Sequence, residues 1–135
     1  MSRNKNQKQP RGNLRDSEYL ELVDNLNRPL GILSRESIHA QNLFHKSVQV
    51  LLFNREKKLF IQQRNHDKDV YPGYWDVSAA GHVQYGESCL DAAIRELDEE
   101  LGISGARLKF IHEFPASYYT GYEFLALLVT GPCSE

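Results

Sequence analysis

The sequence predicts an α+β domain built around a mixed β-sheet. Several short segments rich in β-branched and aromatic residues are separated by turn residues, and only one long segment has apolar residues at helical spacing. No internal repeat or linker-like stretch divides the chain. A length of 135 residues suits one domain with a sizeable core. We therefore expect one folded domain over residues 18–135.

The N-terminal segment differs from this pattern. Residues 1–15 contain five basic residues, no acidic residue and almost no large apolar side chain. A segment of this kind has little surface to bury, so residues 1–17 are expected to form a disordered basic tail. Contact between this tail and RNA is an open alternative to a solvated terminus.

The order of the elements follows from the apolar runs and the turn signals between them. The expected elements are two strands around a turn (18–24 and 29–34), a short helix (34–42), a long strand (47–54), its partner strand (59–64), a loop (66–81), an acidic helix (88–101) and two further strands (106–114 and 122–130). Many strands with few helices are typical of the α+β class.

The acidic helix is the least ordinary part of the sequence. Residues 81–103 hold six of the eighteen acidic residues of the chain and a single basic residue, Arg95. The large apolar residues recur at helical spacing and are expected to form one buried stripe: Leu90, Ile94, Leu97 and Leu101. Gly102 is a natural end for this helix.

Three glutamates, Glu96, Glu99 and Glu100, are expected to share the neighbouring face of the helix. They form like-charge pairs at three- and four-residue spacing, each of which costs roughly 0.2–0.5 kcal/mol. Two of them also stand in the last turn, where the helix dipole favours cations. A divalent cation would reverse each of these penalties, and Mg²⁺ or Mn²⁺ prefers oxygen ligands. We interpret this face as a metal site.

The same segment resembles the signature of the Nudix family. The pattern GX5EX7REUXEEXGU is matched at every specified position, from Gly81 through Glu87 to the run that begins at Arg95 and ends at Ile103. The resemblance covers roughly residues 18–130. It implies an α/β/α sandwich and the hydrolysis of a nucleoside diphosphate linked to another moiety, with Mg²⁺ or Mn²⁺ as cofactor.

The resemblance also implies roles for individual residues. Glu96, Glu99 and Glu100 would hold the metal, and one of them would serve as general base. The backbone carbonyl next to the signature, that of Ala80, would supply a further ligand. Glu87 would brace the loop. Arg95, the arginine of the signature, would orient the carboxylates through charge-assisted hydrogen bonds.

Residues upstream of the signature resemble the branch of isopentenyl-diphosphate isomerase, which moves a carbon–carbon double bond. A cysteine precedes the Gly-His pair in that branch, whereas this chain has Ala80, and Gly121 replaces one acid of a Glu-X-Glu pair. Because the thiol proton donor is missing, hydrolysis is favoured over isomerisation. A catalytically weak Nudix module that binds a nucleotide or a protein is the other alternative.

Further metal ligands are expected outside the acidic helix. His82 aligns with a metal-binding histidine of the isomerase branch, and His39 and His45 lie near the positions of two others. Histidine is a common metal ligand, although a lone histidine in a loop is more often a surface residue. Glu123, at the start of an apolar strand, is expected to act as an additional ligand or base.

Contacts with the substrate are expected from residues before the signature. Arg64 ends a strand and could bind phosphate by a bidentate contact, with Gln62 and Gln63 on the same side. Trp75 is the candidate for stacking on the substrate, together with its neighbours Tyr71 and Tyr74. Packing around the Pro-Gly turn is the alternative for these aromatic residues.

Composition limits the partners. A formal net charge of −2 argues against non-specific nucleic-acid binding by the whole chain, and no run of 18 apolar residues could span a membrane. Cys89 and Cys133 have no metal-like spacing and are expected to be free thiols of a cytoplasmic protein. The expected partner is a small-molecule diphosphate.

After the last predicted strand the sequence continues only with GPCSE. The resemblance implies another strand and a C-terminal helix at this point, so the domain looks short at its C-terminus. Sheet surface left uncovered in this way is expected to meet a partner or a second subunit, as in a homodimer.

Overall fold

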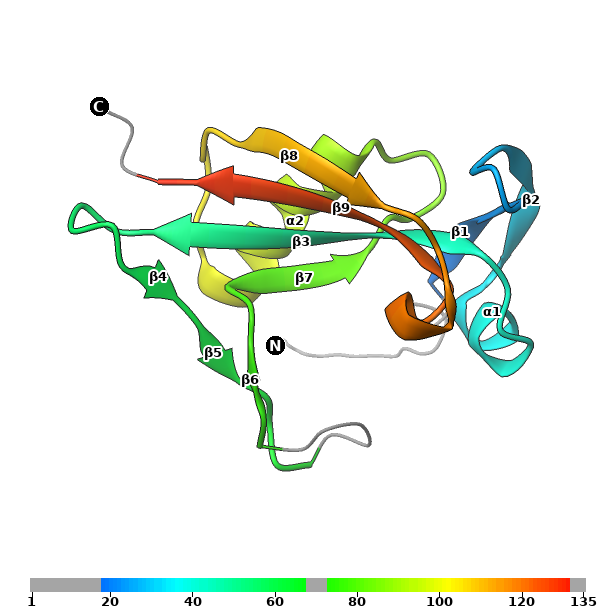
Figure 1. Ribbon diagram of the computed structural model, residues 1–135, viewed down its shortest axis with the longest axis horizontal. Helices are drawn as coiled ribbons and strands as arrows, with labels where there is room; N and C mark the ends of the chain where they lie inside the picture. Colours follow the sequence, from blue (N-terminus) through cyan, green and yellow to red (C-terminus); the bar gives the residue numbers. More distant parts are fainter. Residues whose placement is uncertain (1–17, 68–72, 132–135) are drawn as a thin grey trace, which may run out of the picture.

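A computed structural model describes residues 18–67 and 73–131. The expected basic tail, Tyr71 and Cys133 lie outside these ranges. Figure 1 shows a twisted sheet that crosses the molecule, with the longest helix behind it and a smaller group of elements at one end. The sheet contains both parallel and antiparallel pairs, which confirms the predicted class.

The central strand of the sheet is β3 (His45–Phe53). One of its edges pairs in parallel with β9 (Glu123–Thr130), and the other pairs antiparallel with β7 (Ala79–His82) and β4 (Leu59–Phe60). Strand β8 (Lys109–Phe114) extends the sheet on the far side of β9. Both β3 and β9 begin within a few residues of predicted boundaries, because their long apolar runs are unambiguous.

The long acidic helix α2 (Cys89–Leu101) packs against β7 and β3. Its first turn is capped by Ser88, whose hydroxyl accepts a hydrogen bond from the N–H of Asp91 at 3.0 Å. It ends at Gly102, which has the left-handed φ of 68° that a glycine adopts without strain. The predicted helix and its stop are confirmed.

The face that α2 buries differs from the predicted stripe. Its buried residues are Ala92, Ala93, Glu96 and Leu97. Leu90 and Ile94 remain 46% and 39% exposed, so the prediction that they are buried is wrong. The two alanines allow the helix to approach the sheet closely, and this contact carries one carboxylate into the interface.

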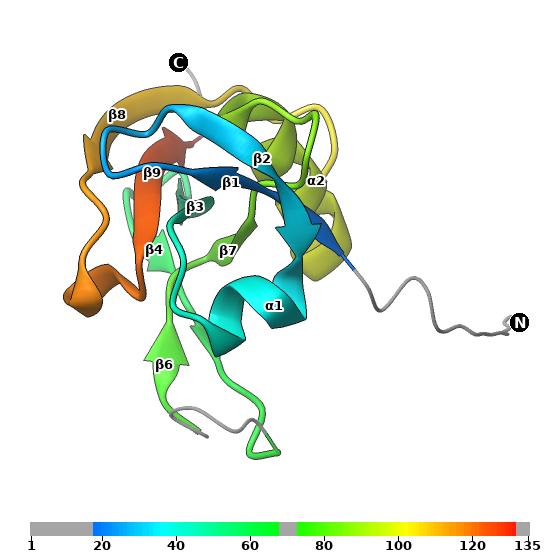
Figure 2. The ribbon, with the colours of Figure 1, turned by 90° about the vertical axis from the view of Figure 1, so that its right-hand side faces the viewer.

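An antiparallel hairpin of β1 (Tyr19–Val23) and β2 (Pro29–Ser34) leads into the short helix α1 (Arg35–Ala40), as predicted. Ser34 caps α1 by accepting a hydrogen bond from the N–H of Ser37 at 3.2 Å. Figure 2 shows the hairpin and α1 at the same end of the sheet. Within the described ranges no helix has the length and apolarity to cross a membrane.

The segment before β7 is less regular than predicted. The expected strand 59–64 divides after Phe60, because β5 (Gln62–Gln63) pairs with β6 (Trp75–Asp76) instead of β3. The segment 66–81, predicted to be a loop, contains β6 and most of β7, so this part of the prediction is wrong. Strands of two to four residues leave too little periodicity to be recognised in a sequence. A short 3₁₀ helix, η2 (Tyr118–Thr120), precedes β9.

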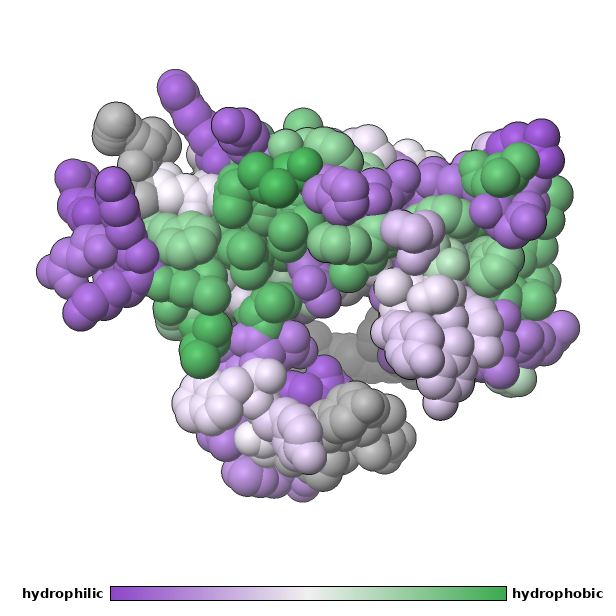
Figure 3. All heavy atoms as spheres, in the orientation of Figure 1, coloured by the Kyte–Doolittle hydropathy of each residue, from purple (hydrophilic) through white to green (hydrophobic). Residues whose placement is uncertain are grey.

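The sheet face opposite α2 is covered by no helix within residues 18–67 and 73–131. Successive residues of β9 alternate between buried and half-buried positions. The half-buried ones include Leu127 and Val129. Figure 3, in the orientation of Figure 1, shows hydrophobic surface over β3, β8 and β9.

Candidate functional site

Arg95 of α2 connects most of the acidic segment. Its Nε and Nη2 atoms donate to the two carboxylate oxygens of Glu87 at 2.7 and 2.9 Å. Its Nη1 atom donates to Glu96 at 2.9 Å and to Glu99 at 3.4 Å, and Nη2 also donates to the carbonyl of His82 at 3.0 Å. One guanidinium therefore holds the loop before the helix, two carboxylates and the end of β7 together. The pKa of Glu87 is lowered by this arginine despite partial burial.

Glu96 is the buried member of the acidic cluster, by which we mean Glu96, Glu99 and Glu100. Its residue surface is 7% exposed. Burial and the adjacent carboxyl of Glu100 raise the pKa of Glu96 to about 8, although Arg95 acts in the opposite direction. Two carboxyls in contact cannot both be charged at low cost unless a cation is shared between them.

Glu100 joins this cluster to the strands in front of it. Its Oε1 atom accepts hydrogen bonds from the side-chain amide of Gln62 at 3.0 Å and from the backbone N–H of Ala80 at 3.4 Å. Ala80 therefore lies beside the cluster, but it contacts Glu100 through its N–H, whereas the predicted metal ligand is its carbonyl oxygen. Gln62 also donates to the carbonyl of Ser78 at 2.9 Å, so its position is fixed from two sides.

Gly81 of β7 lies directly against the side chain of Glu96 on α2. A Cβ atom at this position would overlap the carboxyl group of Glu96. The glycine is needed for space here, since its φ lies outside the left-handed region.

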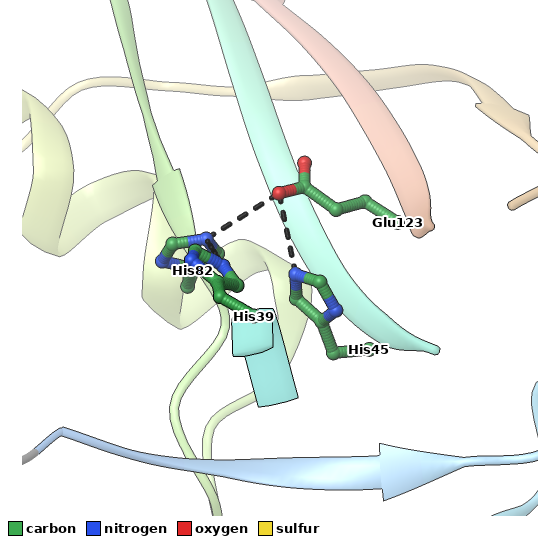
Figure 4. Close-up of side chains that lie close together, drawn as sticks. All are labelled: His39, His45, His82 and Glu123. Carbon is green, nitrogen blue, oxygen red and sulfur yellow. Dashed lines mark hydrogen bonds and ion pairs between the residues drawn. The ribbon is translucent and has the colours of Figure 1, made fainter. Parts of the chain in front are cut away.

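A second group of side chains meets at the other face of β7. It consists of His39 from α1, His45 from β3, His82 from β7 and Glu123 from β9, and we call it the histidine cluster (Figure 4). Each residue offers one ligand atom, and these atoms all lie within 4.8 Å of one another.

The donor atoms of the histidine cluster converge. The Nε2 atoms of His39 and His82 are 3.2 Å apart, and Glu123 lies 3.2 Å from Nε2 of His45 and 3.3 Å from Nε2 of His82. Ligands about 2.0–2.2 Å from a common metal are at most about 4.4 Å apart. The cluster would therefore need to contract only slightly to hold a divalent ion.

The ionisable groups of the histidine cluster shift one another's pKa values. Burial lowers the pKa of His82, but ion pairs with Glu123 and Glu18 outweigh it and raise that pKa to about 9. The pKa of Glu123 lies below its usual range because of His45 and His82, despite its burial. Burial and the neighbouring His82 lower the pKa of His39. A shared cation would remove the need for a charged imidazole.

Strand β7 separates the two clusters. Gly81 faces α2 and the acidic cluster, whereas His82, the next residue, faces the histidine cluster, as the alternation of a strand requires. A cavity of about 1070 Å³ extends around this strand. Residues of both clusters line it: Glu96, Glu99, Glu100, His82 and Glu123.

Only some of the predicted substrate-binding residues lie at the cavity. Arg64 lines the cavity, where its Nη1 atom lies 3.3 Å from a carboxylate oxygen of Asp76. Trp75 and Tyr74 are 65% and 62% exposed and are absent from the described lining, so the structure does not bring them to the clusters. Gln63 lines the cavity and donates to the carbonyl of Gly73 at 2.7 Å.

Two residues near the site gave no signal in the sequence. Glu18 precedes β1, and its Oε1 atom lies 3.8 Å from Nδ1 of His82. Gln84 donates from its side chain to Glu18 at 2.8 Å and from its backbone to Glu87 at 2.9 Å. The sequence shows that Gln84 stands three residues before Glu87. It gives no sign that Gln84 contacts Glu18, which is 66 positions away.

Comparisons with known proteins show the family of this chain. The family model described as NUDIX domain matches residues 43–131. An uncharacterized Nudix hydrolase of Pseudomonas aeruginosa is 47% identical over 94 residues, which cover 70% of this chain and 56% of that protein. The uncharacterized Nudix hydrolase YfcD of Escherichia coli is 37% identical over 92 residues, which cover 68% of this chain and 51% of that protein.

A solved structure shows the same fold. The crystal structure of a Deinococcus radiodurans protein is similar with a TM-score of 0.73 at 27% identity, over 87% of this chain and 74% of that chain. The chain belongs to the Nudix family. It spans little more than half the length of the two curated relatives described above.

Proposed function

We propose that this chain hydrolyses a diphosphate linkage in a substrate of the nucleoside-diphosphate-X type, with Mg²⁺ or Mn²⁺ bound by the acidic cluster. The observation that carries this proposal is the buried Glu96 in contact with Glu100 beside a large polar cavity. Carboxylates crowded in this way are stabilised by a hard cation. Membership of a hydrolase family supports the same reading.

The acidic cluster has the chemistry such a cation needs. Glu96, Glu99 and Glu100 supply oxygen donors, and the contacts of Arg95 fix the orientation of the first two. When bound, the cation would neutralise the diphosphate and activate a water molecule. The residues of this chain would do the rest. Glu87 and Arg95 would hold the loop and the helix in place, and one glutamate of the cluster would accept a proton from the attacking water.

Groups suited to phosphate stand in the wall of the cavity, which supports the predicted role of Arg64. Arg64 lies there with a guanidinium suited to phosphate oxygens, and the amide of Gln62 is held beside Glu100. These groups recognise phosphate and not the moiety attached to it, so they do not distinguish nucleotides from other diphosphates.

We propose the histidine cluster as a second metal centre. Its three imidazoles and one carboxylate suit Mn²⁺, Co²⁺ or Zn²⁺ better than Mg²⁺, which prefers oxygen ligands. It opens to the same cavity as the acidic cluster through His82 and Glu123. The isomerase branch that the sequence resembles remains an alternative for this centre, although position 80 carries no thiol.

The test of hydrolysis is phosphate release from a panel of diphosphates with Mg²⁺ or Mn²⁺, measured directly and after added phosphatase. The panel holds nucleotide sugars, dinucleotides, CoA esters, nucleoside triphosphates and prenyl diphosphates. We expect metal-dependent turnover on one class and a loss of at least about 100-fold in Glu100→Gln. Glu36→Gln, which removes a charge from the same cavity outside both clusters, is the matched control.

Folded protein that releases phosphate from no compound would contradict hydrolysis. Turnover that Glu100→Gln leaves unchanged would contradict the assignment to the acidic cluster. Double-bond isomerisation of a prenyl diphosphate, followed by NMR, would support the isomerase alternative instead.

A further inference from the structure

The two clusters are joined by a closed chain of polar contacts, of which Glu18 and His82 line the cavity. It begins at the carbonyl of His82, which accepts from Arg95, and Arg95 donates to Glu87. Glu87 accepts from the backbone N–H of Gln84, and the Gln84 side chain donates to Glu18. Glu18 then faces the imidazole of His82, which closes the chain.

The last contact places a carboxylate on the Nδ1 side of His82, while Nε2 faces the histidine cluster. Nδ1 lies 3.8 Å from Glu18, and Nε2 lies 3.3 Å from Glu123. His45 shows the same division, since its Nδ1 lies 2.9 Å from the carbonyl of Leu43 while its Nε2 faces Glu123. An acceptor at Nδ1 leaves the lone pair of Nε2 for a metal.

Glu18 is itself held in place. Gln84 donates to its Oε2 atom at 2.8 Å, and Arg35 lies 3.9 Å from its Oε1 atom. The pKa of Glu18 is lowered to about 2, chiefly by His82, so it stays a charged acceptor. The backbone of Gln84 is held in turn, because Gln84 forms an isolated antiparallel β-bridge with Leu20 of β1.

We infer that Glu18 and Gln84 are positioning residues that orient His82 toward a bound divalent ion and link the histidine cluster to the acidic cluster. Neither residue contacts the reacting atoms in this proposal. Glu18 selects the metal-binding nitrogen of His82. Gln84 transmits the position of Glu87, and with it that of Arg95, to Glu18. The inference rests on the second metal centre under the proposed function.

The link makes the two centres dependent on each other. A cation bound by Glu96 and Glu99 competes with Arg95 for their oxygens. Any resulting shift of Arg95 reaches His82 both through its carbonyl and through Glu87, Gln84 and Glu18. The affinity of one centre should therefore change when the other is filled, and by the same factor in both directions.

The experiment titrates the full chain with Co²⁺ alone and follows the visible absorption of the bound ion. We expect Glu18→Gln and Gln84→Leu each to weaken Co²⁺ binding about 10-fold or more, as loss of a partner behind a metal ligand usually does. Glu36→Gln removes the same charge from the same cavity but lies outside the chain of contacts, so its affinity should stay within about twofold. His45→Ala assigns the absorption to the histidine cluster.

A second titration in saturating Mg²⁺ measures the link. In the unaltered chain we expect the Co²⁺ affinity to shift when Mg²⁺ is present. In Gln84→Leu we expect a smaller shift, because only the route through the carbonyl of His82 remains. Thermal melting of each variant confirms that it is folded. If Glu18→Gln does not fold, Gln84→Leu alone tests the inference.

Three results would overturn the inference. They are Co²⁺ affinities equal to the unaltered chain in both variants, a Mg²⁺ effect as large in Gln84→Leu as in the unaltered chain, and no Co²⁺ absorption from the unaltered chain. None of these bears on phosphate release at the acidic cluster, which is measured separately. Failure of the positioning role and failure of hydrolysis can thus be told apart.

Discussion

Gly81 shows how a single residue shapes the acidic cluster. The helix α2 approaches β7 so closely that the carboxyl of Glu96 occupies the space of a side chain on the strand. The same approach buries Glu96 and raises its pKa. The absent side chain of Gly81 is thus one cause of the electrostatics of the acidic cluster.

Gly81→Ala should therefore displace Glu96 and destabilise the fold. We expect a loss of roughly 1–3 kcal/mol in the free energy of unfolding, the usual range for an overpacked site. Adding Glu96→Ala should recover most of the stability and none of the phosphate release. Urea unfolding of the single and double variants measures both changes, and a Gly81→Ala protein as stable as the unaltered chain would be evidence against this packing.

The mutual contacts of some site residues could be predicted from the sequence, and those of others could not. Glu87, Arg95 and the acidic cluster were found because a dense motif ties them together within 23 residues of sequence. The like-charge penalty was overestimated for Glu99, because Arg95 stands four residues before it and reaches it. Glu18 has no such motif, since its partners come from distant parts of the chain.

At the scale of the element, α2 is positioned by its ends. Ser88 caps the first turn, and Gly102 ends the last one with its N–H bonded to the carbonyl of Asp98. No basic residue stands in the last turn. The helix therefore relies on its first turn and on packing against β7 for stability.

Loss of the cap should be measurable on its own. Ser88→Ala is expected to lower the free energy of unfolding by about 1 kcal/mol, because one N–H of the first turn loses its acceptor. Ser104→Ala, at an exposed position after the helix, should change it by less than about 0.5 kcal/mol. Equal effects of the two substitutions in urea unfolding would argue against the capping role.

Elements were predictable where apolar runs were long. The hairpin, α1, β3, α2 and β9 all form close to their expected ranges. The orientation of α2 was not predictable, because Leu90 and Ile94 look like core residues until the close approach of the alanine face is known. Strands β5 and β6 pair over only two residues each, and such a contact depends on the fold around it.

At the scale of the molecule, burial and ion pairing raise the pKa values of two groups in the described part of the chain to near or above neutrality, while the pKa of His39 is lowered. Glu96 rises from 4.5 to about 8 and His82 from 6.5 to about 9. Glu18 and Glu123 are lowered, so the stability they contribute is lost only in acid, below about pH 4.5.

The metal-free protein should therefore lose stability as pH rises. A group whose pKa is higher in the folded state stabilises that state most below its unfolded pKa, and this contribution disappears as pH rises through the folded value. We expect the free energy of unfolding in EDTA to fall between about pH 6 and pH 9. Glu96→Gln should flatten the lower part of this fall, and Mg²⁺ should raise stability most at the alkaline end.

Urea unfolding at a series of pH values, with EDTA or with Mg²⁺, measures this dependence. A free energy of unfolding in EDTA that stays level or increases from pH 6 to pH 9 would contradict the burial of Glu96 and the pairing of His82.

Strand β7 has one more property that follows from its place in the sheet. Only β3 pairs with it among the described strands, so the backbone groups of its other edge are open to hydrogen bonding. Side chains bind two of these groups: Glu100 accepts from the N–H of Ala80, and Arg95 donates to the carbonyl of His82. The residues proposed for catalysis thus also close an edge that could otherwise recruit a strand from another molecule. Replacing them would open a route to self-association, and an inactive variant of this site could be inactive because it has aggregated.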